Sequence, residues 1–301
     1  MTNGTVRVLL EVLKKEIYVI IQNFKSFLLS CMLLTIFIIN LIGNDSQAIE
    51  GDCKTFIENG DSYYDRYQNT LALREYGMAY QICPDNFDAL VKLTRAYDDC
   101  GEDLKGIKPG ENRPVEAEEY FQNAVKYSEI LLQKFPEKLE TYFLLALSYG
   151  NLSRYKDGKE KVELARYIEE YAKKAIEVDP NFAPAYVVLG IYYREVASLN
   201  GLKKAIANGL MGGLITGTFE ESEKSLNKAL KLSPQSPFVH FELGRTYEEM
   251  NRIDIAIEHY KQVIELPVAD HDDIRKKKIA EERLKVLQDS EYNMATKISG
   301  D

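Results

Sequence analysis

The sequence has no tryptophan, only three histidines and no excess of positive charge. Its 38 Lys and Arg residues are outnumbered by 47 Asp and Glu residues, which gives a formal net charge of -9. Binding to a nucleic-acid backbone relies on clusters of Lys and Arg, so this balance argues against a nucleic-acid partner. The hydrophobic fraction of 45% excludes a chain that is disordered throughout and is enough for a folded core.

The motifs of catalysis and of metal binding are also missing. His240, His259 and His271 stand in no HExxH or comparable spacing, and His240 is expected to pack inside the protein rather than to bind a metal. The acidic run from Asp98 to Asp103 lacks the residue order of an EF-hand loop. No nucleophile stands with a base. We therefore expect no enzymatic activity, no metal and no cofactor.

An uncharged apolar stretch covers residues 27–43 with the sequence FLLSCMLLTIFIINLIG. Basic residues precede it and acidic residues follow it, which predicts a cytoplasmic N-terminus and an extracytoplasmic location for the rest of the chain. Seventeen residues are few for a membrane span and slightly many for a signal h-region. Cleavage after Ala48 and retention as a membrane anchor are therefore both open. The protein would be periplasmic, secreted, or anchored with its following domain outside.

Internal periodicity is the strongest signal in the sequence. Residues 53–86 carry small and aromatic residues at fixed offsets: Gly60, Tyr63, Ala72, Tyr76, Ala79 and Pro84. This spacing resembles the tetratricopeptide repeat (TPR), a 34-residue pair of antiparallel helices. A second unit begins at Pro237 and repeats the offsets with Leu243, Gly244, Tyr247, Ala256 and Tyr260.

Three expanded units lie between these two. Their first helices carry Tyr97, Tyr149 and Tyr193, and their second helices end at Pro136, Pro180 and Pro234. The extra 18, 10 and 20 residues fall between the two helices of each unit, where loops or longer helices do not disturb stacking. The third insertion, SLNGLKKAIANGLMGGLITGT, is rich in glycine. It is either a flexible apolar flap or a short helix with glycine caps.

These units predict an all-α fold: a right-handed TPR-like solenoid of about five repeats with extended or inserted inter-helix segments, preceded by one apolar membrane-targeting helix. The predicted order is a cytoplasmic n-region (1–26), an h-region or anchor (27–43), a linker (44–52), the solenoid (53–289) and a polar tail (290–301). A charged helix from Asp272 to Gln288 should cap the last repeat. Its packing residues would be Ile274, Ile279, Leu284 and Leu287.

Two cysteines suggest a disulfide. Cys53 opens the first helix of the first repeat and Cys83 closes the second helix. Because the helices of a repeat are antiparallel, the two thiols should be neighbours. A bond between them would suit an oxidising compartment and would stabilise the first repeat. The alternative is two buried thiols.

The resemblance to TPR proteins also implies a binding surface, because partners of such solenoids usually lie against the first helices. The residues expected to face the concave side are Ile57, Val91, Arg95, Phe143, Leu147, Val187, Ile191, Phe241 and Arg245. The centre of this groove would be apolar and its ends polar. An amphipathic helix or an extended peptide of a partner protein fits such a groove. The alternative is a carrier or transporter-accessory protein for a hydrophobic small molecule or lipid.

The C-terminal stretch resembles a more specific family. Leu243, Gly244, Tyr247, Pro267 and Asp273 stand as in the end of the regulator of microtubule dynamics family, where a Leu-Gly-x-x-Tyr helix leads to a Pro-ended helix, an acidic turn and a final helix. The general layout also resembles extracytoplasmic TPR subunits of bacterial solute transporters. Both resemblances imply binding without catalysis.

Overall fold

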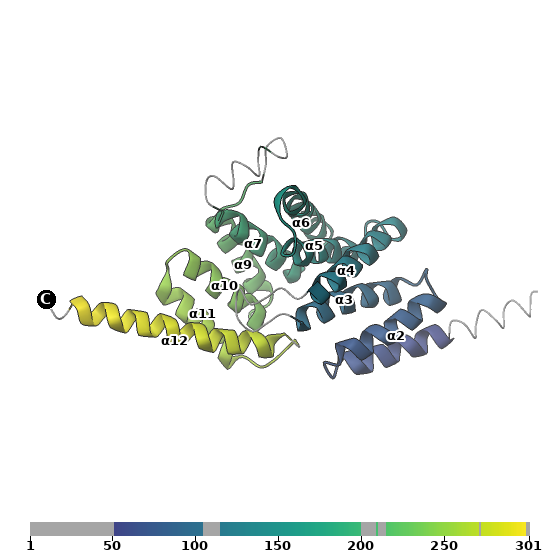
Figure 1. Ribbon diagram of the computed structural model, residues 1–301, viewed down its shortest axis with the longest axis horizontal. Coiled ribbons are helices and arrows are strands. Elements are labelled where there is room, and N and C mark those ends of the chain that lie inside the picture. The colour runs from purple at the N-terminus through teal and green to yellow at the C-terminus, as the bar shows by residue number, and fades with distance from the viewer. Residues whose placement is uncertain (1–50, 105–114, 200–208, 210–214, 271, 299–301) are drawn as a thin grey trace, which may run out of the picture. The chain divides into compact units, whose positions relative to one another are not determined.

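The computed structural model describes residues 51–104, 115–199, 209, 215–270 and 272–298. Within these residues the chain forms helices and turns and no β-strand, as the sequence predicts. The chain divides into a unit of residues 1–55 and a unit of residues 56–301, and the second contains the repeats. Figure 1 shows its helices in chain order.

A helix covering residues 51–64 opens the described chain. The helices that follow are α2 (Asn69–Ile82), α3 (Phe87–Asp103), α4 (Val115–Lys134), α5 (Leu139–Ser153), α6 (Gly158–Val178), α7 (Ala183–Ala197), α9 (Phe219–Leu232), α10 (Pro237–Glu249), α11 (Ile253–Glu265) and α12 (Asp273–Ile298). Side-chain caps start several of them, because the first amides of a helix need acceptors. Asn86 caps α3, Thr218 and Glu221 form a capping box on α9, and Ser236 caps α10.

The helices pack as consecutive pairs. Each first helix packs on the second helix of its own repeat, as in α3–α4, α5–α6, α7–α9 and α10–α11. The first helices also contact one another in succession, from α3 to α5, α7 and α10. We call these four first helices the inner layer. This pattern is that of a TPR-like solenoid and confirms the predicted class of fold.

A glycine and an aromatic ring set the distance between the two helices of a repeat. A Cβ atom added to Gly60 would lie 2.3 Å from the ring of Tyr76, and one added to Gly244 would lie 2.8 Å from the ring of Tyr260. Both glycines are therefore needed for close approach of the helices rather than for an unusual backbone conformation. The repeat offsets read from the sequence correspond to this contact.

The two regular repeats also turn in the same way. Tyr67 and Asn251 both adopt left-handed conformations, with φ of 59° and 56°. The next amide then donates to the carbonyl of the tyrosine at the end of the first helix, at 3.0 Å for Gln68 to Tyr63 and at 2.8 Å for Arg252 to Tyr247. The turn between the two helices therefore lies at the same repeat position in both repeats, as the glycine–tyrosine contact does.

The insertions are partly built into longer helices. Helices α4 and α6 contain 20 and 21 residues, so the extra residues of the second and third repeats extend regular structure. The glycine-rich insertion of the fourth repeat lies mostly outside the described residues. Its end is described: Ile215 is buried in the core that Tyr193 and Val196 also form.

The final helix caps the last repeat as expected, with one exception. Ile279, Leu284 and Leu287 of α12 are buried in the core shared with α10 and α11. Ile274 is 60% exposed, so its predicted packing role is wrong. At the start of α12 the buried side chains are instead those of Asp273 and Lys276.

The N-terminal apolar stretch at residues 27–43 lies outside the described residues. Among the helices that the structure describes, none combines the length and apolar character that a membrane crossing requires.

The glycine contacts predict a contrast between two alanine variants. Gly244→Ala should lower the free energy of unfolding by about 1–3 kcal/mol, because its methyl group would overlap the Tyr260 ring. Gly77→Ala on α2 meets no atom within 4 Å and should leave stability unchanged or raise it by up to about 1 kcal/mol through helix propensity. Urea unfolding of both variants measures this, and equal responses would contradict the close-crossing model.

Candidate functional site

The predicted groove residues fall into two apolar clusters. Val91, Phe143 and Leu147 pack around the buried leucines of α3, α4 and α5. Val187, Ile191 and Phe241 belong to a second cluster that continues into α10 and α11. The rings of Phe143 on α5 and Phe182 before α7 meet edge to face, with centroids 5.1 Å apart. The apolar centre of the inner layer is therefore continuous with the core below it.

Only part of this apolar set reaches solvent. Ile57, Val187 and Phe241 are buried, so they act mainly as core. Val91, Phe143, Leu147 and Ile191 are half-buried. These four side chains define the apolar floor of the candidate site, which spans α3, α5 and α7.

The two predicted groove arginines are both engaged within the chain. Arg95 on α3 lies 3.7 Å from Asp99 and 3.5 Å from Asp270, and its guanidinium stacks 4.9 Å from the ring of Tyr64. Arg245 on α10 lies 3.6 Å from Glu242 and 3.7 Å from Glu195. The polar ends expected from the sequence are thus present, but they are held by ion pairs.

A buried ion pair joins two helices of the inner layer. Arg194 on α7 is fully buried, and its Nη1 donates to the carboxylate of Glu242 on α10 at 2.7 Å. Burial alone would raise the pKa of Glu242, but Arg194 and then Arg245 outweigh it and hold the pKa at about 2. The guanidinium also lies 3.3 Å from Glu195 and 3.5 Å from each of Thr246 and Glu249. The pair is therefore ionised at neutral pH, and the buried Nε of Arg194 makes no hydrogen bond.

The acidic run of α3 has structural partners. Asp98 is buried and accepts hydrogen bonds from Ser148 at 2.6 Å and Asn151 at 3.0 Å, both on α5. Burial raises the pKa of Asp98 to about 7 despite these bonds. Glu102 lies 3.8 Å from Arg154 and 3.2 Å from Arg275. The run thus links α3 to α5 and to the start of α12.

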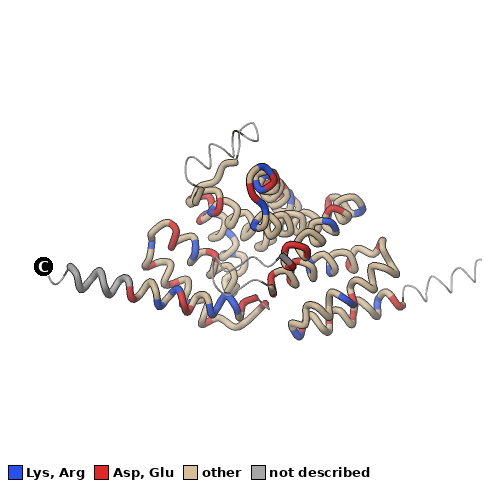
Figure 2. The backbone as a smooth tube through the Cα atoms, viewed as in Figure 1, with Lys and Arg blue, Asp and Glu red and all other residues tan. Residues whose placement is uncertain are grey.

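Most residues of the basic run Arg275 to Lys278, at the start of α12, form ion pairs or hydrogen bonds within the chain. Arg275 pairs with Asp272 at 2.6 Å and with Glu102. Lys276 bonds Asp272 and lies 4.2 Å from the centre of the Phe238 ring. Lys277 donates to the carbonyl of Ile264 at 2.9 Å and to that of Leu266, at the end of α11. Both acidic and basic residues occur along α11 and α12 (Figure 2).

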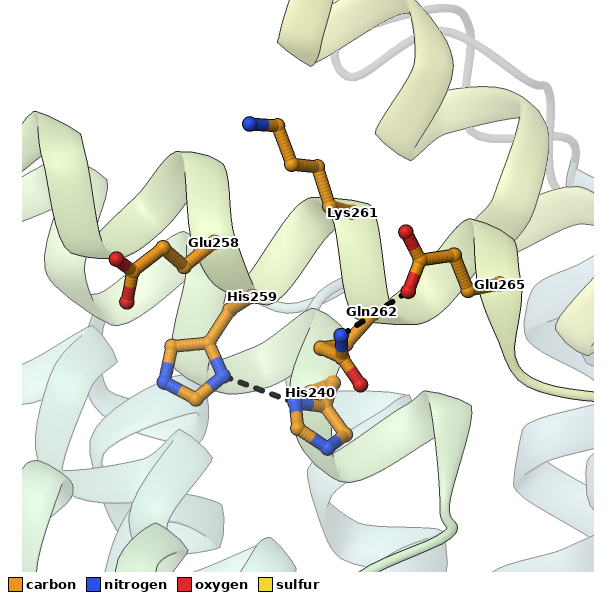
Figure 3. Close-up of a pocket in the computed structure, with 6 residues that line it drawn as sticks. All are labelled: His240, Glu258, His259, Lys261, Gln262 and Glu265. Carbon is orange, nitrogen blue, oxygen red and sulfur yellow. Dashed lines mark hydrogen bonds between the residues drawn. The ribbon is translucent and has the colours of Figure 1, made fainter.

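A pocket of about 330 Å³ lies between His240 on α10 and the side chains of α11. Figure 3 shows the rings of His240 and His259 facing each other in it, with their Nδ1 atoms 2.9 Å apart. Burial lowers the pKa of His240, and burial with His240 as neighbour lowers that of His259 to about 4. One neutral ring therefore donates to the other. Within the described residues no group of three potential ligands could hold a metal.

The cysteines differ in state. Cys53 and Cys83 are each disulfide-bonded, whereas Cys100 is a buried free thiol. Burial raises the pKa of the Cys100 thiol to about 12, which makes it unreactive at neutral pH. The pairing of Cys53 with Cys83 stays a prediction.

Sequence reasoning missed the residues that bring the inner layer together. Arg194 and Glu242 lie 48 positions apart, and neither is among the residues predicted to line the groove. A usable signal was present for Arg194 alone: it lies with Glu195 at the end of an otherwise uncharged helix, APAYVVLGIYYREVA. Helix α10, PFVHFELGRTYEE, carries several charges, so Glu242 does not stand out in it.

Comparison with known proteins supports the more specific resemblance. Residues 56–288 match the family model described as regulator of microtubule dynamics protein 1-3. Regulator of microtubule dynamics protein 3 of Mus musculus is 26% identical over 196 residues, which are 65% of this chain and 40% of the mouse protein. Regulator of microtubule dynamics protein 1 of Bos taurus is 25% identical over 57% of this chain and 53% of its own length. The chain thus spans about half the length of these relatives or less.

A solved structure shares the fold. A thermophilic TPR protein of Thermus thermophilus superposes with a TM-score of 0.55 and 21% identity, covering 75% of this chain and 98% of its own. This likeness concerns the fold alone. It agrees with the TPR frame read from the sequence.

The expected extracytoplasmic location is wrong. The matching family and the mouse and bovine relatives are described as regulators of microtubule dynamics, and microtubules are cytoplasmic polymers. The charge argument assumed that residues 27–43 cross a bilayer, and these lie outside the described residues.

The buried ion pair can be tested against an exposed pair of the same length. Glu242→Ala would leave Arg194 buried and uncompensated and should lower the free energy of unfolding by about 3–5 kcal/mol. Asp85→Ala removes the exposed Asp85–Lys134 pair, which is also 2.7 Å long, and should cost at most about 1 kcal/mol. Chemical denaturation of both variants measures the difference. Similar losses of unfolding free energy would show that burial does not set how much each ion pair contributes to stability.

The raised pKa of Asp98 predicts an effect of pH on stability. Between about pH 4 and pH 7 the folded state keeps a proton on Asp98 that the unfolded state has lost. The free energy of unfolding should therefore fall as pH rises through this window, by a few kcal/mol at most. Asp98→Asn removes this titration, so urea midpoints of the two proteins should converge or cross toward pH 7. Parallel curves would contradict the raised pKa.

Proposed function

The chain belongs to the regulator of microtubule dynamics protein 1-3 family, and on this premise we propose that it is a protein-interaction scaffold that binds a component of the microtubule system through its inner layer. The proposed contact is an amphipathic helix or an extended peptide of the partner, which lies along the first helices. The proposed mode is binding without catalysis.

The observation that carries this proposal is the half-buried apolar floor formed by Val91, Phe143, Leu147 and Ile191. Burying an exposed side chain of this size contributes up to about 1.5–3 kcal/mol, whereas exposed ion pairs contribute about 0–1 kcal/mol. The apolar floor should therefore supply most of the affinity. Because Arg95 and Arg245 already pair within the chain, their part is to align the guest.

A basic surface patch is a weaker basis for binding. The densest basic run, Arg275 to Lys278, makes its hydrogen bonds and ion pairs inside the protein. The net charge of -9 also disfavours attraction to an acidic filament surface. Apolar contact in the inner layer is the better-supported mode.

The proposed domain plan keeps residues 53–289 as one binding unit, with residues 290–301 as a tail. We propose that the uncharged stretch of residues 27–43 attaches this unit to a membrane, with residues 44–52 as the linker. The apolar composition of the stretch supports this attachment.

The proposal predicts that the apolar floor controls affinity. Leu147→Ser combined with Ile191→Ser should weaken binding to purified tubulin, as dimers or as polymerised microtubules, by a factor of ten or more. Fluorescence titration and co-sedimentation measure the two forms. Circular dichroism should show the helical fold retained, because both side chains are only half-buried.

The matched control replaces apolar residues outside the inner layer. Met78 on α2 and Val178 at the end of α6 are 40% and 47% exposed, and Met78→Ser with Val178→Ser should leave tubulin binding unchanged. If the inner-layer variant is folded and still binds at full strength, the guest sits elsewhere. Lipid recovered with the purified protein in place of tubulin binding would support the carrier alternative.

A further inference from the structure

One end of the inner layer is already occupied by a remote part of the chain. Asp270, between α11 and α12, lies 3.5 Å from Arg95 on α3, and Arg275 in the first turn of α12 lies 3.2 Å from Glu102 on the same helix. We call Asp270 and residues 272–276 the clasp. Arg275 and Glu102 are 173 positions apart, so the clasp joins the last repeat to the second.

The clasp holds its shape by its own bonds. The carboxylate of Asp273 accepts hydrogen bonds from the backbone amides of Ala269 and Asp270, both at 2.9 Å. Asp272 pairs with Arg275 and Lys276 within the first turn of α12. The clasp is thus preformed and presents Asp270 to α3 as a fixed carboxylate.

The clasp is held to the last repeat and to α3 by different kinds of contact. Helix α12 is rooted in the last repeat by buried apolar side chains, whereas Asp270 meets α3 through charge. The side chains of Arg95 and Asp270 are 49% and 44% exposed, and ion pairs this exposed are weak and screened by salt. The Asp270–Arg95 contact is therefore the part of the clasp that another carboxylate can displace.

Resting on the function proposed above, we propose that Asp270 occupies a site on Arg95 that an acidic residue of the protein partner uses. When the partner binds along the inner layer, the carboxylate of that acidic residue replaces the carboxylate of Asp270 on Arg95. Arg95 and Leu147 occupy the same repeat position on the adjacent helices α3 and α5. Packed helices lie about 8–10 Å apart, and an extended peptide advances about 3.3 Å per residue. The acidic residue of an extended partner would thus lie about three residues from the apolar residue that contacts Leu147.

The test is a double-mutant cycle on tubulin binding. Asp270→Ala removes one of the two carboxylates that pair with Arg95, the other being Asp99, and should tighten binding about two- to five-fold at low salt. The gain should vanish in the Arg95→Ala background and at high salt. Asp254→Ala, an exposed aspartate at the start of α11, changes the net charge equally and should leave the affinity unchanged.

A second measurement needs no partner. Asp270→Ala and Arg95→Ala should each raise hydrogen exchange in residues 272–276, because each removes one of the two ion pairs that hold the clasp on α3, the other being Arg275–Glu102. Unchanged exchange in both would overturn the Asp270–Arg95 attachment. If the intact protein binds tubulin and Asp270→Ala gives no gain, or the gain persists without Arg95, the stand-in role alone fails. If no variant binds tubulin while exchange rises, the tubulin proposal and the stand-in role fail together and the clasp contact stands.

Discussion

The close crossing of the two helices within a repeat is the constraint on which the rest of the solenoid depends. At Gly60 and Gly244 the absence of a side chain lets a tyrosine ring lie directly on the opposite helix. This contact sets how far apart the helices lie and which faces they present to the next repeat. The matching turns at Tyr67 and Asn251 follow from the same geometry. With the distance between the paired helices set, the first helices of successive repeats pack side by side and form the inner layer.

That inner layer combines two kinds of surface with different consequences. Its apolar floor continues from the core, so the residues proposed to contact a guest also pack against the residues that stabilise the fold. Its charges, led by Arg194 and Glu242, are satisfied by one another. A buried ion pair is a modest source of stability but a strict condition on geometry, because either partner alone is costly. The pair therefore specifies how α7 and α10 meet.

The start of α12 changes how the inner layer is understood. A terminal cap normally covers the apolar end of a repeat array, and α12 does this through Ile279, Leu284 and Leu287. The same helix returns charge to α3 through the clasp, so the second and last repeats are in electrostatic contact. The basic residues Arg275, Lys276 and Lys277 at the start of α12 bond within the chain. Apolar residues on α5 and α7 are left as the better candidates for recognition.

The sequence by itself determined the helical class, the repeat frame and the capping helix, because each of these follows from local spacing along the chain. It also indicated the family from a few residues near the C-terminus, such as Leu243 and Pro267. It misplaced Ile274, since the side of the first turn of α12 that faces inward depends on Asp273 bonding to the preceding amides. It misassigned the compartment, because a charge asymmetry around residues 27–43 does not establish a crossing. Only the tertiary structure decided which charges meet, as in Glu102 with Arg275. Such pairs have no period in the sequence, because they form where the curvature of the solenoid brings remote segments within reach.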